Sequence, residues 1–252
     1  MSFDVAAEAY DAFMGRYSRL LSAQLADVAG VHPGQRVLDV GCGTGALTGE
    51  LVTRLGAASV AAVDPSRPFV AAIAERYPGV EVREASAGAL PFADDAFDAT
   101  LAQLVVHFMN EPVADLIELR RVTRPGGVVA ACVWDHAGGQ GPLRVFWDAV
   151  RTLDPDVDDE SQLPGTREGH LEELFAEAGL QAIEGTALSI RVEHPGFDAW
   201  WEPFTRGVGP AGAYLRRVDA ARHDAIREAA RRAIADGPFA ITAVAWAARG
   251  LA

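Results

Sequence analysis

Glycines cluster at the end of a short apolar segment near the start of the chain, where residues 37–45 read Val-Leu-Asp-Val-Gly-Cys-Gly-Thr-Gly. Glycine has no Cβ, so the backbone can turn tightly there and approach a bound ligand closely. A helix that follows directs its free N–H groups at the same ligand. The run also fits the loose dinucleotide pattern G-x-G-x-x-G/A, so the glycines alone leave NAD(P) open as a ligand.

Two carboxylates accompany this turn. Asp39 stands two positions before the first glycine, where dinucleotide-binding folds normally carry an apolar residue. A carboxylate at that position suits a cationic group such as a methionine ammonium and would repel a pyrophosphate. Asp64 ends the next apolar segment, 21 positions after Gly43, and can accept two hydrogen bonds from a ribose diol. Since NAD and S-adenosylmethionine share that diol, Asp64 indicates a nucleoside without choosing between them.

Several segments together resemble one family. The run over 37–45 resembles the first motif of class I S-adenosylmethionine-dependent methyltransferases. Other segments are similar to the ubiquinone/menaquinone-type members, which carry a methyltransferase type 11 domain: Ala89-Leu90-Pro91-Phe92 with Phe97-Asp98, the turn over 121–127, and Phe13-Met14-Gly15-Arg16-Tyr17-Ser18. The resemblance covers residues 10–135 and weakens afterwards.

The resemblance implies a cofactor, S-adenosylmethionine, with S-adenosylhomocysteine as product, and a small organic acceptor methylated on carbon or oxygen rather than nitrogen. Relatives usually read Gly-Asp-Ala-Glu before the segment at 89–92, whereas this chain reads Ala-Ser-Ala-Gly, so Ser86 replaces a carboxylate that accepts from adenine. A hydroxyl there lacks the charge assistance of a carboxylate. The implied cofactor-binding residues are Arg16, Asp39, Gly41, Cys42, Gly43, Asp64, Pro65, Ser66, Ser86, Ala87 and Gln103.

Alternating strands and helices position these residues. Apolar runs predict strands over 36–40, 59–64, 80–84, 97–106, 128–134, 180–192 and 239–247, and helical periodicity predicts helices within the first 30 residues and over 47–55, 68–77, 113–123, 170–178 and 214–235. This order predicts an α/β fold with a parallel sheet. The resemblance adds that the sheet is Rossmann-like, with seven mostly parallel strands, an antiparallel last strand and helices on both faces. We expect one domain, with an N-terminal helical segment (1–30), a cofactor-binding core (31–135) and a small helical substrate cap inserted at 193–236.

Catalytic candidates follow the predicted strands. His107 comes after the fourth strand, at the edge where the acceptor should lie, and is the predicted general base because histidine titrates near neutrality. His136 follows the fifth strand and is a second candidate. Trp200, Trp201 and Phe204 are predicted either to bind an apolar acceptor from the cap or simply to pack the cap onto the domain. The other four histidines have no partners at metal-ligand spacing, so no metal is predicted.

Composition limits the partners. The 252-residue chain has a net charge of −13, which repels nucleic acid and anionic membranes. No apolar run approaches the roughly 20 residues of a membrane span, and the N-terminus does not resemble a signal peptide, so a cytoplasmic location is expected. The acidic stretch over 153–161 is predicted to be a surface loop and the arginine-rich helix over 214–235 a solvated face. An NAD(P)-dependent oxidoreductase and a non-catalytic S-adenosylmethionine-binding protein remain alternatives, and the oligomeric state, a homodimer included, stays open.

Overall fold

A single seven-stranded sheet organises the computed structural model, which describes residues 7–252. Its strands lie in the order β3-β2-β1-β4-β5-β7-β6. β1 to β5 pair in parallel, whereas β7 is antiparallel to both β5 and β6. The predicted fold is therefore confirmed, with only the last strand reversed. The strands are β1 (Val37–Val40), β2 (Val60–Asp64), β3 (Glu81–Glu84), β4 (Phe97–Gln103), β5 (Thr123–Trp134), β6 (Gln181–His194) and β7 (Phe239–Leu251).

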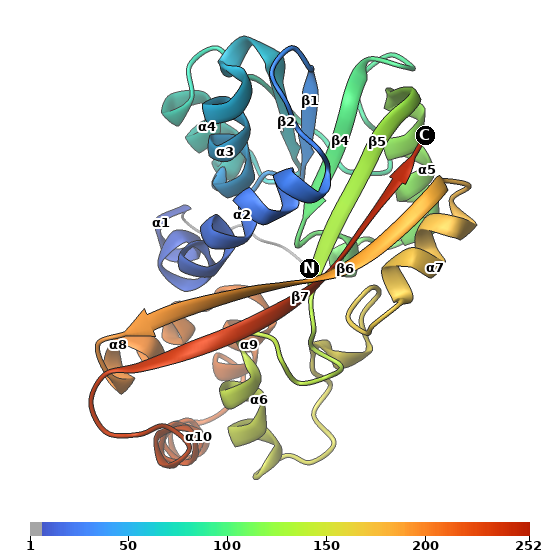
Figure 1. Cartoon of the computed structure of the whole chain (residues 1–252). Helices are drawn as coiled ribbons and strands as arrows, with labels where there is room; N and C mark the ends of the chain where they lie inside the picture. Colours follow the sequence, from blue (N-terminus) through green and yellow to red (C-terminus); the bar gives the residue numbers. More distant parts are fainter. Residues whose placement is uncertain (1–6) are drawn as a thin grey trace.

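Helices cover both faces of this sheet (Figure 1). One face carries α2 (Arg16–Val28), α3 (Ala46–Leu55) and α4 (Arg67–Arg76), and the other carries α5 (Pro112–Val122) and α7 (His170–Glu177). Successive side chains of a strand point to opposite faces. Along β5, accordingly, Cys132 and Trp134 belong to the core on the α2 side, whereas Ala131 and Val133 belong to the core on the α5 side.

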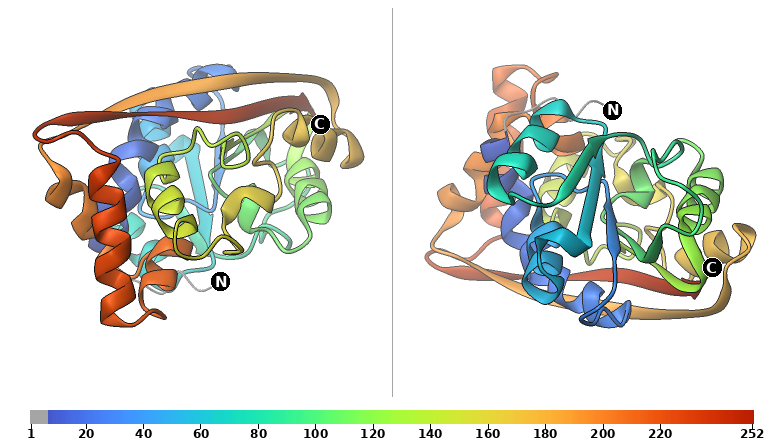
Figure 2. Two further views of the ribbon diagram at one scale, coloured as in Figure 1. Left: turned by 90° about the horizontal axis from the view of Figure 1, so that it is seen from below. Right: turned by 90° about the horizontal axis from the view of Figure 1, so that it is seen from above.

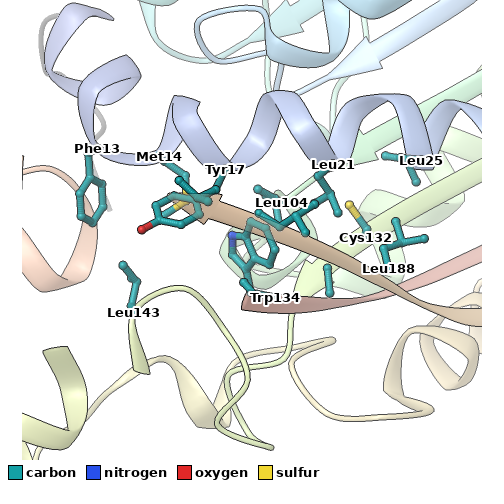
Figure 3. Packing of buried hydrophobic residues seen from close by; sticks show 14 of the residues in the cluster. Phe13, Met14, Tyr17, Leu21, Leu25, Leu104, Cys132, Trp134, Leu143 and Leu188 are labelled. Atoms are coloured by element: carbon teal, nitrogen blue, oxygen red, sulfur yellow. The ribbon is translucent and has the colours of Figure 1, made fainter. Parts of the chain in front are cut away.

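The N-terminal segment packs across the end of the sheet. It runs through α1 (Ala7–Tyr10) and a π-helical turn (Asp11–Gly15) into α2. Figure 3 shows Leu21 of this segment beside Leu104 and Trp134, near the ends of β4 and β5. The predicted N-terminal helix is thus confirmed for residues 7–28, and residues 1–6 lie outside the described part of the chain.

The last two strands are much longer than their neighbours. β7 pairs with β5 only as far as Ala245 opposite Trp134, but it pairs with β6 as far as Phe239 opposite His194. The two strands therefore leave the sheet as a two-stranded ribbon, visible in Figure 2. Between them the chain forms α8 (Phe197–Trp201), a 3₁₀ turn (Glu202–Arg206), α9 (Gly209–Leu215) and α10 (Ala220–Arg232). Together with α6 (Arg144–Arg151), these helices lie at the projecting end of the ribbon.

Several predicted boundaries were wrong, and one helix was missed. The single helix over 214–235 is two helices, because Asp219 caps a new one by accepting a hydrogen bond from the Arg222 N–H. The fourth strand ends at Gln103 because Leu104 has a φ of 60°. The fifth strand begins at residue 123, since the glycines at 126 and 127 pair with the last residue of the chain. Finally, α6 was not predicted at all.

No helix in the described residues has the length and apolar character that crossing a membrane requires.

Candidate active site

The glycine turn after β1 is held in a shape that only glycine tolerates. Gly41 has a φ of 69°, and a Cβ built on it would lie 2.4 Å from Cγ2 of Val105. The N–H groups of Gly41 and Cys42 donate to the carbonyl of Val63 in β2, at 2.8 and 3.0 Å. The turn therefore lies against the ends of β2 and β4, and α3 starts directly behind it.

Asp64 at the end of β2 organises the turn. Its Oδ2 accepts from the Gly43 N–H at 2.9 Å, and its Oδ1 accepts from the Ser66 N–H at 2.8 Å. The side chain is only 7% exposed, and burial raises its pKa above the ordinary value despite these two bonds. Each carboxylate oxygen still has a second lone pair available for a ligand hydroxyl.

A large cavity of about 660 Å³ opens beside these groups, at the carboxyl ends of β1, β2 and β4. Ligand pockets in proteins commonly measure about 300–1,000 Å³, and this end of a parallel sheet is where ligands bind in open α/β folds. Seven of the eleven predicted cofactor residues line it: Gly41, Gly43, Asp64, Pro65, Ser66, Ser86 and Ala87. Other lining residues are Tyr10, Phe69, Leu104, Val105, Phe108, Met109 and Asn110.

The other four predicted residues do not line the large cavity. Asp39 is buried and accepts a hydrogen bond from the Thr48 hydroxyl at 2.6 Å, and burial raises its pKa to about 7. Cys42 is buried, which raises the pKa of its thiol. Gln103 donates to the carbonyl of Ser18 at 3.1 Å. These three are therefore buried beside the turn and do not face the large cavity.

Arg16 is directed elsewhere. Its guanidinium donates to the carbonyls of Ala12 and Ala199 and lies 3.2 Å from Nδ1 of His194. Since all these partners belong to the N-terminal segment and the projecting end of the ribbon, the structure does not bring Arg16 to the large cavity.

The N-terminal segment closes one side of the large cavity, which the sequence did not predict. Tyr10 lines the cavity, packs edge-on against Phe69, and lies 3.9 Å from the position of a Cβ on Gly43. Its neighbour Asp11 accepts a hydrogen bond from the hydroxyl of Thr44 in the glycine turn. The only signal in the sequence was an aromatic residue at helical spacing, which equally fits a core position.

His107 lies in a separate, smaller cavity of about 30 Å³. This small cavity is also lined by His136 and Glu160, and it shares Tyr10, Leu104 and Phe108 with the large one. Burial and the neighbouring His136 lower the pKa of His107 well below 6.5. Titration near neutrality, the reason for predicting a general base, is therefore lost.

Burial has opposite effects on the other two groups of the small cavity. It lowers the pKa of His136 to about 4 and raises that of Glu160 to about 7. Glu160 lies in the stretch over 153–161 that was predicted to be a surface loop, yet it is only 4% exposed, in a 3₁₀ turn (Glu160–Gln162). The surface-loop prediction was wrong for this residue because the indole of Trp147 donates to its Oε2 at 3.0 Å inside the fold.

Trp200, Trp201 and Phe204 pack rather than line a cavity. All three are at most 4% exposed, and Phe204 stacks on Phe146 of α6 with ring centres 4.8 Å apart. None of the three lines the large or the small cavity. Of the two roles considered from the sequence, the structure supports packing of the helical segment onto the domain.

Comparison with known proteins identifies the core of the chain. Residues 38–131, which carry the glycine turn, Asp64 and His107, match the family described as "Methyltransferase domain". This segment is similar to methyltransferase domains. The predicted resemblance is confirmed.

Curated relatives agree over the methyltransferase domain and its flanks. The chain is 38% identical over 121 residues to a demethylmenaquinone methyltransferase of Renibacterium salmoninarum, covering 48% of this chain and 50% of that protein. It is 35% identical over 164 residues to a malonyl-[acyl-carrier protein] O-methyltransferase of Halorhodospira halophila, covering 58% and 55%. An uncharacterized protein of Mycobacterium tuberculosis is 33% identical over 171 residues, covering 64% and 60%. The chain thus spans only about half to three fifths of these relatives.

Solved structures share the fold beyond the methyltransferase domain. A putative methyltransferase from Bacillus halodurans superposes with a TM-score of 0.59 and 15% identity over 91% of this chain and 97% of that one. A [4+2]-cyclase, SpnF, gives 0.56 and 20% over 92% and 80%. Since one fold hosts different reactions, the site residues rather than the fold must carry the functional argument.

Proposed function

We propose that this protein transfers a methyl group from S-adenosylmethionine to a small organic molecule and releases S-adenosylhomocysteine. The observation that carries the proposal is the large cavity, in which Asp64 presents a buried carboxylate beside a turn that glycine keeps open. Gly41 and Gly43 would lie along the methionine and ribose, and Asp64 would accept from the ribose hydroxyls. A cavity of about 660 Å³ with a buried carboxylate at its edge suits a ribose diol, so these residues fit the cofactor.

The adenine ring of the nucleoside would lie between two short segments that follow β2 and β3. Pro65 and Ser66 follow β2, and Ser86 and Ala87 follow β3, on the same cavity. We assign these four residues to the adenine ring, with Ser86 contributing one neutral hydrogen bond where relatives use a carboxylate.

A dinucleotide fits the sheet less well. A dinucleotide-binding fold repeats its parallel nucleotide-binding half on the far side of the switch point. Here the strand next to β5 is β7, which is antiparallel. The ribbon of β6 and β7 therefore takes the place of a second nucleotide-binding half. The structure therefore favours S-adenosylmethionine over NAD(P).

Bound S-adenosylmethionine supplies an electrophilic methyl on a sulfonium. The chain contributes alignment and exclusion of water, and alignment can be worth about 7–11 kcal/mol in favourable systems. On the acceptor side the large cavity is lined by apolar groups, including Leu104, Phe108 and Met109. An apolar or aromatic acceptor, methylated on carbon or oxygen, fits this lining, and the segment over 193–236 would cover it as a cap.

Surface charge supports a small-molecule partner. The net charge is −13, and Arg222, Arg227 and Arg232 of α10 each pair with a carboxylate. We therefore extend the proposal to a cytoplasmic enzyme that does not act on nucleic acid.

Calorimetry tests the proposal directly. Purified protein should bind S-adenosylhomocysteine and leave NAD⁺ and NADP⁺ unbound. Incubation with methyl-labelled S-adenosylmethionine and a panel of hydroxylated aromatic and quinol compounds should label at least one of them. Absence of S-adenosylhomocysteine binding at millimolar concentration would contradict the proposal. Binding without transfer to any compound would favour the non-catalytic alternative.

A further inference from the structure

Three potential metal ligands meet in the small cavity. His107 follows β4, His136 follows the adjacent strand β5, and Glu160 reaches the same place from the loop after α6. One ligand atom from each residue lies within 4.8 Å of the other two. Their spacing in the sequence, 29 and 24 residues, hides this convergence, which arises from the parallel pairing of β4 and β5.

One of these three residues has an unpaired buried ring nitrogen, and the other two do not hydrogen-bond to each other. Nδ1 of His107 is buried and has no hydrogen-bond partner in the described part of the chain. Nε2 of His136 lies 3.9 Å from Oε1 of Glu160, too far for a hydrogen bond. A buried polar atom without a partner is destabilising and needs an explanation, and a bound ligand would supply one for Nδ1 of His107.

The remaining contact of Glu160 orients it toward the histidines. The indole of Trp147 donates to Oε2 at 3.0 Å, which leaves Oε1 facing His136. In metal sites, a hydrogen bond to the outer oxygen of a ligating carboxylate fixes its orientation in this way.

We propose that His107, His136 and Glu160 bind one divalent first-row transition metal ion. Two imidazoles and one carboxylate form the protein ligand set of catalytic zinc and of non-haem iron sites, which keep an open position for water or substrate. Tetrahedral zinc with bonds of about 2.1 Å places its ligand atoms roughly 3.4 Å apart. The ligand atoms lie within 4.8 Å of one another, so binding zinc would require the side chains to move together by up to about 1.4 Å.

The open position of this ion would face the acceptor. The small cavity shares Tyr10, Leu104 and Phe108 with the large cavity, so an acceptor oxygen could reach the metal while its nucleophilic atom faces the methyl group. A bound cation lowers the pKa of such an oxygen. This role rests on the proposed function, whereas metal binding itself does not.

Zinc titration of tag-free protein tests the site. After treatment with EDTA and dialysis, calorimetry with ZnCl₂ should show one ion per chain, and Co²⁺ should produce visible absorption bands. Glu160→Gln keeps an oxygen that can accept from the Trp147 indole, so we expect it to fold. It should weaken zinc binding more than 100-fold, beyond the roughly 10–100-fold typical of changes outside the ligand set. His136→Asn should act likewise, and His32→Ala, at an exposed histidine, should bind zinc like the wild type.

The outcomes separate this proposal from the previous one. S-adenosylhomocysteine binding, measured on each folded variant, should not change, because none of the substituted residues lines the large cavity. Wild-type protein without stoichiometric zinc or cobalt binding would overturn the metal site, and so would equal affinities in the wild type, Glu160→Gln and His136→Asn. Loss of S-adenosylhomocysteine binding in the wild type would instead overturn the proposed function.

Discussion

Replacing Asp64 by asparagine tests the two predicted roles of this side chain, which are to hold the glycine turn and to accept hydrogen bonds from a ribose. The substitution preserves its shape but leaves one acceptor oxygen where there were two. Because the two oxygens accept from the N–H groups of Gly43 and Ser66, an asparagine in either orientation turns an NH₂ group toward one backbone donor. Both the turn and the predicted ribose contact should therefore weaken.

The size of each effect follows from the hydrogen bonds involved. Loss of one hydrogen bond from a ligand hydroxyl to a charged acceptor costs about 1.5–3 kcal/mol, which corresponds to an affinity loss of about 10- to 100-fold. The unpaired N–H belongs to Gly43 or Ser66, and both residues are half-buried. Because water can partly satisfy such a group, we expect the free energy of unfolding to fall by about 1 kcal/mol, the low end of the cost of an unpaired buried donor.

The assay pairs S-adenosylhomocysteine calorimetry with urea unfolding, so that affinity is compared only between folded proteins. Glu84→Gln is the matched control. It removes the same charge from another carboxylate of the large cavity, but Glu84 is 47% exposed and pairs with Arg67. We expect its affinity to stay within about twofold of the wild type.

Two results would refute the reasoning. Folded Asp64→Asn protein with wild-type affinity would mean that no hydroxyl of the ligand contacts this carboxylate. Equal losses in Asp64→Asn and Glu84→Gln would mean that the overall charge of the cavity, rather than a specific contact, governs binding.

Three further substitutions test the surroundings of the cavity. Gly41→Ala should lower stability by more than 2 kcal/mol in urea unfolding, because its Cβ meets a valine side chain at 2.4 Å. Gly34→Ala, with positive φ but open space, should cost only about 1 kcal/mol, and equal losses would contradict the steric argument. Asp39→Asn tests the raised pKa of about 7. A raised carboxyl pKa makes its contribution to stability fall from pH 4 to pH 7, by up to about 1.4 kcal/mol per pH unit, and the pH dependence of unfolding should be flatter in the variant. Asp11→Ala should weaken S-adenosylhomocysteine binding about tenfold by releasing the N-terminal segment from the glycine turn, whereas Arg19→Ala, which removes one exposed pair of Asp11, should not.

The sequence predicted the core of the site because its signals are local. The glycines after β1 and the carboxylate at the end of β2 follow short apolar strands, and parallel strands bring their carboxyl ends together. Gly41, Gly43 and Asp64 therefore line one cavity, as expected.

The remaining errors concern contacts between distant segments. Glu160 lies in an acidic run that predicts a solvated loop. In the structure it is buried and accepts a hydrogen bond from the indole of Trp147, which lies in the unpredicted helix α6. The sequence around Arg16 does not indicate whether its guanidinium binds a ligand carboxylate or a backbone carbonyl. In the structure its partners include the carbonyl of Ala199, 183 residues away. Aromatic residues such as Trp200 look the same in sequence whether they line a pocket or fill a core.

The ribbon formed by β6 and β7 has a consequence for the order of events in turnover. A two-stranded ribbon is barely stable by itself, and here its tip is fastened to the N-terminal helix: Arg16 and Tyr17 both contact His194. The same helix continues into the segment that closes over the glycine turn. Under the proposed function, displacing that segment to release S-adenosylhomocysteine would therefore disturb these contacts at the tip, so we expect product release and movement of the tip helices to be coupled.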